Sequence, residues 1–290
     1  DLVRACYALR PEGIEWPLRE DGSPSFKLEL LTAANGIDHG QAHDALADVR
    51  ATIALARLIK EKQPKLFDYA FSLRQKAHVI KQINLQQLTP LVHVSSKIPA
   101  SQGCCTWILP VAQHPSNPNA IICVDLSKDP QAILNENAET LRSLLYARQE
   151  SFEEGQQRPG IKLIHINRSP FITTAKALTE DNADRLGLNR DQCLENYKRL
   201  AEDNAWRDTL IELYNEPHED SEVDADHALY SGGFLTNEEK HWCDDVREAQ
   251  PEQLSVLAER MQNPKLKTLL FRYRARNYPH TLTFEESQRW

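Results

Sequence analysis

The sequence lacks several features that would assign it to a special class of protein. No run approaches the ~18 consecutive apolar residues of a membrane-spanning helix, so we expect no membrane contact. No internal repeat or low-complexity tract is present. Six cysteines occur without a Cys-x-x-Cys pair, which favours reduced thiols in a cytoplasmic protein over a disulfide framework or a zinc site. With 41% hydrophobic and 26% charged residues over 290 positions, the composition is that of a globular chain with two or three domains.

The chain also lacks an initiator methionine. It opens at Asp1 inside a helical pattern, in which Leu2, Cys6 and Leu9 are apolar, and it ends at Trp290 directly after a polar run. We therefore expect both ends to be cuts within a longer protein.

Basic residues are in the minority, and the formal net charge is −8. The acids are concentrated between residues 216 and 252, where twelve acids stand against two bases, so the rest of the chain carries a net charge of +2. Residues 50–81 hold eight basic residues against two acidic ones. A local basic strip matters more for phosphate binding than the global sum. Charge alone favours a solvated helix face here, and leaves a phosphate-binding strip as the alternative.

The first 63 residues read as helices joined by loops. We expect Ser25 to cap a helix over 26–34 that stops at Asn35-Gly36, and Asp44 to cap a long helix over 45–62. Gln63-Pro64 ends the long helix and marks the first domain boundary. The long helix should bury an apolar stripe with near-helical spacing, made of Ala45, Val49, Ile53, Ala56 and Ile59.

The middle of the chain reads as a β-rich module with inserted helices. Turn-rich segments separate the apolar runs that we expect to be strands, at 91–94, 106–109, 120–124 and 162–166. Helical patterns interrupt them at 136–149 and 190–202. After an acidic linker over 216–226, Thr236 and Glu239 form a capping-box pattern, and helices follow at about 237–248, 252–262 and 264–276. We expect Arg272, Arg274 and Arg276 to form ion pairs with the acidic segment.

The segment Ala42–Thr52 carries the pattern His-x-Ala-x-x-Asp-x-x-x-Thr. If His43 precedes the helix and Asp44 caps it, the imidazole can swing over the first turn while Asp48 projects from the second. The carboxylate can then hold a hard cation such as magnesium, and a neutral histidine can take a proton from the attacking water.

Other interpretations of this segment remain open on spacing alone. His39 and His43 have the spacing of a zinc pair, but no third ligand stands out. The dipeptide His43-Asp44 is also found in HD-type metal phosphohydrolases, whose further histidines are missing here. The most ordinary interpretation is a capped amphipathic helix with no catalytic role, and spacing by itself favours it.

A resemblance to a known family favours the catalytic interpretation of this segment over a capped helix with no catalytic role. Ala42–Thr52 resembles the third motif of DEDD exonucleases of the subclass with a histidine (DEDDh). Further segments resemble bacterial exonuclease I along the whole chain, at 4–13, 63–69, 90–95, 162–167, 183–189 and 270–277.

The resemblance implies an α+β protein in three parts. Residues 1–63 would be the C-terminal part of an RNase H-like DEDDh exonuclease domain, 64–216 an SH3-like β-barrel domain with inserted helices, and 217–290 a truncated C-terminal helical domain. It implies a hydrolase, a DNA-repair and recombination nuclease that removes 5′-mononucleotides from the 3′ end of single-stranded DNA with Mg²⁺. Such a protein is expected to be a monomer.

The resemblance also assigns site residues. His43 would be the catalytic base and Asp48 a metal ligand, one of four carboxylates around two metal ions. The others, including the Asp-x-Glu motif, would lie upstream of residue 1, so this chain alone should cleave little. The residues expected to bind DNA are Arg4, Lys27, Lys76, Asn119, Lys162, Leu163, Ile164, His165, Ile166, Asn167 and Tyr230.

The resemblance implies one protein partner, the single-stranded-DNA-binding protein, which would contact a basic surface. Arg10 and Tyr69 match that surface, whereas Thr179 and Ala201 stand at two of its basic positions.

Two other functions remain as alternatives. The first is a different DEDDh nuclease, such as a proofreading subunit or an oligoribonuclease, but those are usually short single-domain chains. The second is a catalytically incomplete module that binds single-stranded DNA or docks a partner.

Overall fold

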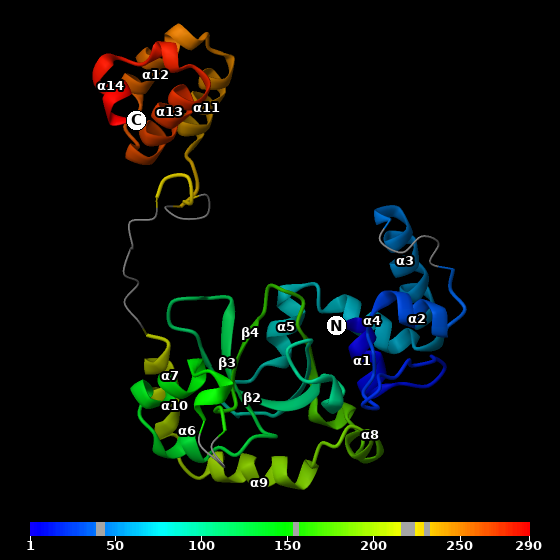
Figure 1. The fold of residues 1–290 in the computed structure, drawn as a ribbon. Coiled ribbons are helices and arrows are strands. Elements are labelled where there is room, and N and C mark those ends of the chain that lie inside the picture. Colours follow the sequence, from blue (N-terminus) through cyan, green and yellow to red (C-terminus); the bar gives the residue numbers. More distant parts are fainter. Residues whose placement is uncertain (39–43, 153–156, 216–223, 229–232) are drawn as a thin grey trace. The chain divides into compact units, whose positions relative to one another are not determined.

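The computed structural model describes residues 1–38, 44–152, 157–215, 224–228 and 233–290. The chain divides into two compact units, Asp1–Glu216 and Pro217–Trp290, which we treat separately (Figure 1). None of the described helices is long and apolar enough to cross a membrane.

An antiparallel sheet forms the centre of the first unit. Its strands are β1 (Leu91–Val94), β2 (Cys105–Gln113), β3 (Ala120–Asp125), β4 (Ile161–His165) and β5 (Phe171–Thr174). The order across the sheet is β4-β3-β2-β1-β5, and a register shift between Pro110 and Ala112 marks a bulge in β2. Every residue of β2 except the last is buried, as expected for a central strand covered on both faces. Four of the five strands were expected from the sequence, and β5 was not.

Helices surround the sheet on several sides (Figure 1). Those of the first unit are α1 (Leu2–Leu9), α2 (Leu28–Ala34), α3 (Ala45–Lys62), α4 (Pro64–Ser72), α5 (Lys76–Gln82), α6 (Gln131–Asn135), α7 (Ala138–Tyr146), α8 (Glu180–Arg185), α9 (Arg190–Ala201) and α10 (Ala205–Leu213).

Helix α1 joins two hydrophobic cores. Ala5, Ala8 and Leu9 pack into the large core around the sheet, whereas Cys6 packs into a smaller core with residues of α2 and α3. All four side chains are at most 2% exposed. Burying apolar side chains on two faces of one short helix fixes its position between the sheet and the α2–α3 pair.

Two local predictions about this region were wrong. Ser25 does not cap α2: it is buried, the N-cap residue is Lys27, and no side chain caps the helix. The apolar stripe of α3 was also misplaced, except that Ile59 is buried as expected. Val49 and Ile53 are 54% and 45% exposed, and the buried residues are Ala51, Leu55 and Ile59. Both stripes have helical spacing, so periodicity alone could not tell which of them faces the neighbouring helices.

The second unit is helical. It contains α11 (Asn237–Glu248), α12 (Leu254–Arg260), α13 (Pro264–Asn277) and α14 (Phe284–Arg289). Residues of α11, α12 and α13 form a small core that includes Trp242, Leu254 and Leu270. The predicted capping box between Thr236 and Glu239 is confirmed at the start of α11.

The three arginines of α13 form ion pairs, as predicted, but not all with the same segment. Arg272 binds the carboxylates of Asp224 and Asp226, with N–O distances of 2.6 and 2.8 Å. Arg276 also binds Asp226, so the segment 224–228 is held against α13. Arg274 instead points into the unit, where it is 2% exposed and lies 2.7 Å from Glu286 of α14.

Candidate nucleic-acid interface

Asp48 lies in the first turn of α3, whereas we expected it in the second turn. The helix begins where predicted: the Asp44 side chain accepts a hydrogen bond from the Ala47 amide at 3.0 Å. Asp48 is half-buried, and its backbone carbonyl accepts a hydrogen bond from the Thr52 hydroxyl at 2.8 Å. His43 lies outside the described residues, so its relation to Asp48 stays a prediction. Within the described ranges, no group of three or more His, Cys, Asp or Glu side chains could hold a metal ion.

The first basic hollow lies beside α1 and the start of α2. It has a volume of about 440 Å³ and includes four cationic side chains, those of Arg4, Arg19, Lys27 and Lys97. The Arg4 guanidinium stands 5.3 Å from the centre of the Phe26 ring, and its Nε is buried without a hydrogen-bond partner among the described residues. The structure therefore brings together Arg4 and Lys27, which were predicted to bind DNA, and adds two cations.

The second basic hollow continues from the first, because Lys97 lines both. It has a volume of about 500 Å³, and its charged side chains are Lys97, Lys128, Arg158, Lys162 and Asp125. Burial lowers the pKa of Lys162, and the charges of Lys97 and Lys128 act in the same direction, while Asp125 opposes them. An anion placed in this hollow would relieve the repulsion among the cations.

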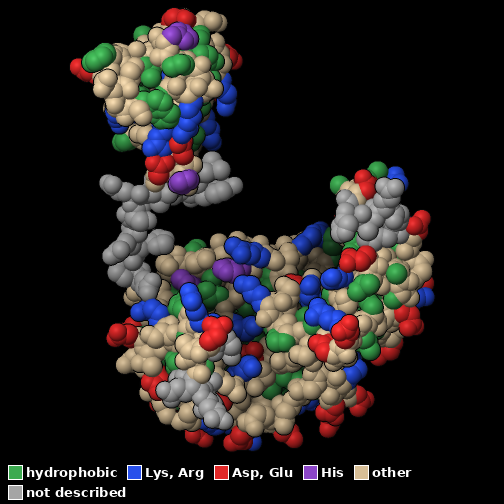
Figure 2. Space-filling model, viewed as in Figure 1, with side chains coloured by type: hydrophobic (Ala, Val, Ile, Leu, Met, Phe, Trp, Pro, Cys, Tyr) green, Lys and Arg blue, Asp and Glu red, His purple; other side chains and the backbone are tan. Residues whose placement is uncertain are grey.

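Figure 2 shows Lys and Arg side chains gathered around a hollow in the first unit, with some acidic side chains among them and many more along the lower edge of the unit in this view. This local gathering of cations shows how a chain of negative net charge can still offer a phosphate-binding surface. It could not be read from the charge count, which sums over both faces.

A third group of predicted residues lies at the opposite edge of the sheet. The Lys76 ammonium group donates a hydrogen bond to Asn119 Oδ1 at 2.6 Å, and the Ile166 amide donates to the Asn119 carbonyl at 2.9 Å. His165 pairs with Ala120 across the β3–β4 ladder. Burial lowers the pKa of His165, and the nearby charge of Arg168 adds to this effect.

The predicted segment Lys162–Asn167 does not expose all its side chains. Ile164 and Ile166 are 3% and 5% exposed, so they belong to the core and their side chains offer no surface to a ligand. Lys162, Leu163 and His165 are half-buried, and Asn167 is exposed. The predicted base-stacking residue Tyr230 lies outside the described residues.

The missed cations Lys97 and Lys128 meet at one edge of the sheet, and the strand order explains why. Strands β1 and β3 both pair antiparallel with β2, so they run in the same direction and end at the same edge of the sheet. Lys97 and Lys128 each follow the last residue of one of these strands by three positions. Lys162 lies at the start of β4, which pairs antiparallel with β3 and therefore begins at that same edge.

A separate, mostly apolar hollow contains the two residues predicted to bind a protein partner. It has a volume of about 350 Å³, and Arg10, Tyr69, Leu66 and Phe171 are among its lining residues. The Tyr69 hydroxyl donates a hydrogen bond to the Ile172 carbonyl at 2.7 Å, which holds α4 against β5. Thr179 and Ala201, the non-basic substitutes, occupy the N-cap of α8 and the last position of α9.

Comparison with known proteins identifies the parts of the chain. The family model of the exonuclease I SH3-like domain matches residues 74–216, and that of the exonuclease I C-terminal domain matches residues 223–290. Exodeoxyribonuclease I of Escherichia coli is 44% identical over the whole chain, which covers 61% of that protein. Exodeoxyribonuclease I of Haemophilus influenzae is also 44% identical over the whole chain, which covers 62% of it.

Solved structures agree with this result. The crystal structure of E. coli exonuclease I with a dA16 oligonucleotide matches with a TM-score of 0.87 and 44% identity, covering 100% of this chain and 62% of that one. A zinc-bound complex of E. coli exonuclease I with single-stranded DNA matches with a TM-score of 0.84 and 43% identity, covering 100% and 61%. A structure described as SSB/exonuclease I with an inhibitor has a TM-score of 0.81 and 43% identity, covering 100% and 60%.

The chain therefore spans about three fifths of the length of these relatives. Two domain models of exonuclease I match the chain, and 44% of its residues are identical to a relative over its whole length. The chain belongs to the exonuclease I family.

Proposed function

We propose that this chain supplies the DNA-binding surface and part of the catalytic site of a magnesium-dependent 3′→5′ exonuclease acting on single-stranded DNA. The observation that carries the proposal is the pair of adjoining basic hollows that share Lys97. Phosphate contacts supply the part of the affinity that does not depend on base sequence. The relatives named exodeoxyribonuclease I and the dA16 complex support the choice of substrate.

Asp48 fits the part of a metal ligand. Its carboxylate oxygens are the hard donors that Mg²⁺ prefers. Because Asp48 lies in the first turn of a capped helix, the backbone from which its side chain extends is held in place. We propose that the remaining carboxylates come from residues that precede Asp1, and that the 290 residues alone are inactive. When bound, the cation would stabilise the negative charge that builds up on the phosphodiester.

The residues of this chain would position the substrate and move one proton. Arg4 and Lys27 would hold the phosphates near the 3′ end, and Lys97 and Lys162 those further along the strand. His43, directly before the Asp44 cap, would take the proton from the attacking water, for which a neutral imidazole is suited. Release of one 5′-mononucleotide at a time would follow from the repeated advance of the strand through the basic hollows.

We further propose a cytoplasmic monomer that works in DNA repair and recombination and contacts the single-stranded-DNA-binding protein. The hollow that contains Arg10 and Tyr69 is the candidate for that contact, and the structure described as SSB/exonuclease I supports it. Isothermal titration calorimetry with the purified partner tests this proposed contact. Arg10→Ala should weaken binding of the partner, whereas Arg185→Ala, on α8 outside the hollow, should not. Equal affinity for both variants would remove this surface from the proposal.

The nuclease assay uses the polypeptide that includes the residues preceding Asp1. It is incubated with a 5′-labelled single-stranded oligonucleotide and magnesium, beside an Asp48→Asn variant. Progressive shortening that the substitution and EDTA both abolish supports the exonuclease. Asp38→Asn serves as a matched control on an acidic residue that lies before the predicted motif, and it should leave shortening intact.

The same assay distinguishes the exonuclease from one alternative function. Salt-sensitive binding of the oligonucleotide without shortening in any form of the protein would favour a module that binds single-stranded DNA or docks a partner. No binding in any form would contradict both functions.

A further inference from the structure

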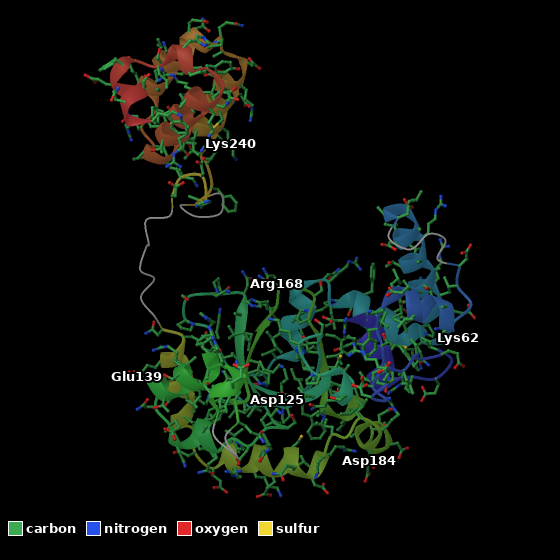
Figure 3. The ribbon with its side chains drawn as sticks, in the orientation of Figure 1. Lys62, Asp125, Glu139, Arg168, Asp184 and Lys240 are labelled. Atoms are coloured by element: carbon green, nitrogen blue, oxygen red, sulfur yellow. The ribbon has the colours of Figure 1, made fainter. Side chains whose placement is uncertain are left out.

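The second basic hollow contains a carboxylate whose two oxygens have different surroundings. Asp125, the last residue of β3, is 7% exposed and lies in the body of the first unit (Figure 3). Its Oδ1 accepts three hydrogen bonds, from the Thr106 hydroxyl at 2.6 Å, the Ser127 hydroxyl at 2.7 Å and the Ser127 amide at 3.1 Å. Three donors on one oxygen fix the orientation of the whole carboxylate.

The other oxygen of Asp125 has no such partners. Across the described ranges, no donor lies within hydrogen-bond distance of Oδ2, and no lysine or arginine forms an ion pair with the carboxylate. Asp125 lines the hollow together with Lys97, Lys128, Arg158 and Lys162. The turn contacts of Oδ1 explain why an acid stands at this position. They leave Oδ2 as an acceptor on a residue that lines a cavity whose other charged side chains are positive.

A nucleotide offers groups that match both kinds of side chain. Its phosphate accepts hydrogen bonds from lysine and arginine, and most bases carry an exocyclic amine that donates to a carboxylate. Cytosine, adenine and guanine have such an amine. Thymine and uracil have none, and two carbonyl oxygens flank their single ring N–H, which would face the carboxylate unfavourably. The volume of about 500 Å³ is sufficient for one nucleotide.

We propose that the second basic hollow reads one base of the bound strand, with Asp125 Oδ2 accepting a hydrogen bond from the exocyclic amine while Lys97 and Lys128 contact the adjoining phosphate. The site therefore disfavours thymine and uracil. This inference rests on the proposed function, because it takes single-stranded DNA as the ligand.

The test measures the affinity of the 290-residue chain for 5′-labelled oligonucleotides by fluorescence anisotropy at neutral pH and fixed salt. Homopolymers of deoxycytidine and deoxyuridine are compared, because they have rings of the same size and neither has a methyl group. We expect the deoxycytidine oligonucleotide to bind about tenfold more tightly or better, as the low end of one charge-assisted hydrogen bond would give.

Asp125→Asn provides a readout that a purely structural role would not change. The hydroxyl groups and the amide at Oδ1 still require an acceptor, so the asparagine oxygen takes that place and its NH₂ group faces the hollow. The variant should lose the preference for deoxycytidine or reverse it, because an NH₂ donor suits a carbonyl edge. Lys128→Gln should weaken binding of both oligonucleotides by the same factor and keep their ratio.

The outcomes separate the inference from the function on which it rests. Equal affinity of the unmodified chain for the two oligonucleotides overturns the base-reading role and leaves DNA binding intact. A preference that survives unchanged in a folded Asp125→Asn variant also overturns it. If that variant does not fold, the comparison with the unmodified chain decides alone. Absence of salt-sensitive binding to either oligonucleotide overturns the proposed function as well.

Discussion

His93 should make the stability of the first unit depend on pH between about 6.5 and 4. It lies in β1, is 7% exposed, and its Nδ1 is 3.0 Å from the Phe171 carbonyl oxygen, to which it donates as a neutral ring. Burial lowers its pKa from 6.5 to about 4, and the nearby charge of Lys162 acts in the same direction, against the hydrogen bond to Phe171. In the unfolded chain the ring keeps its ordinary pKa.

The sign follows from proton uptake. Between pH 6.5 and 4 the unfolded chain binds a proton on His93 and the folded chain does not, so the free energy of unfolding falls as the pH is lowered through this window. Both states are neutral above the window, where the stabilisation is fully present. Between pH 7.5 and 4.5 the loss attributable to this one group is about 2–3 kcal/mol.

The assay is urea denaturation of the full chain at several pH values, followed by the fluorescence of its tryptophans. His93→Gln keeps a donor for the Phe171 carbonyl but cannot take up a proton. Its stability should therefore fall by about 2–3 kcal/mol less between pH 7.5 and 4.5. His280→Gln, at an exposed position of the second unit, should follow the unmodified chain. Parallel pH profiles for the unmodified chain and His93→Gln would refute the reasoning.

Three other predictions concern a helix cap, DNA contacts and a buried ion pair. Asp44→Ala removes the cap of α3 and should lower stability by about 1 kcal/mol in urea denaturation, whereas Asp44→Asn should cost much less; equal losses would contradict the cap. Lys27→Gln and Lys97→Gln should each weaken binding of single-stranded DNA and lower the slope of log affinity against log salt by about 0.7; an unchanged slope would exclude a phosphate contact. Glu286→Gln leaves the buried Arg274 without its charged partner and should destabilise the second unit by about 1–2 kcal/mol, seen as faster amide hydrogen exchange in α13; unchanged exchange would show that the pair contributes nothing.

The sequence was sufficient to predict those structural elements that a strong local signal specifies. The Asp44 cap, the capping box at Thr236 and the first four strands are confirmed, because each depends on side chains within a few residues of one another. Local signals were insufficient where tertiary packing decides. Strand β5 is four residues long, and it is a strand because Phe171–Thr174 pairs with β1. The buried face of α3 depends on which apolar stripe packs against α2. Val49 and Ile53 are not on that face and are exposed to solvent.

The candidate site was predictable in part for the same reason. Arg4 and Lys27 came from the resemblance, and the structure places both in one hollow. Lys97 and Lys128 come from different loops, and they meet because β1 and β3 end at the same sheet edge. That relation requires the strand order, which the sequence did not provide. Ile164 and Ile166 share a predicted strand with Lys162, yet they face the core because side chains alternate along a strand.

We propose that the basic surface around Lys97, which lines both hollows, binds single-stranded DNA through its phosphates. The most direct test is the affinity of the 290-residue chain for a labelled single-stranded oligonucleotide over a series of salt concentrations. We predict a steep linear fall of log affinity with log salt, and a smaller slope when Lys97 and Lys162 are replaced by glutamine together. A chain that does not bind the oligonucleotide at low salt, or binds it with a slope that the double substitution does not change, would contradict the account.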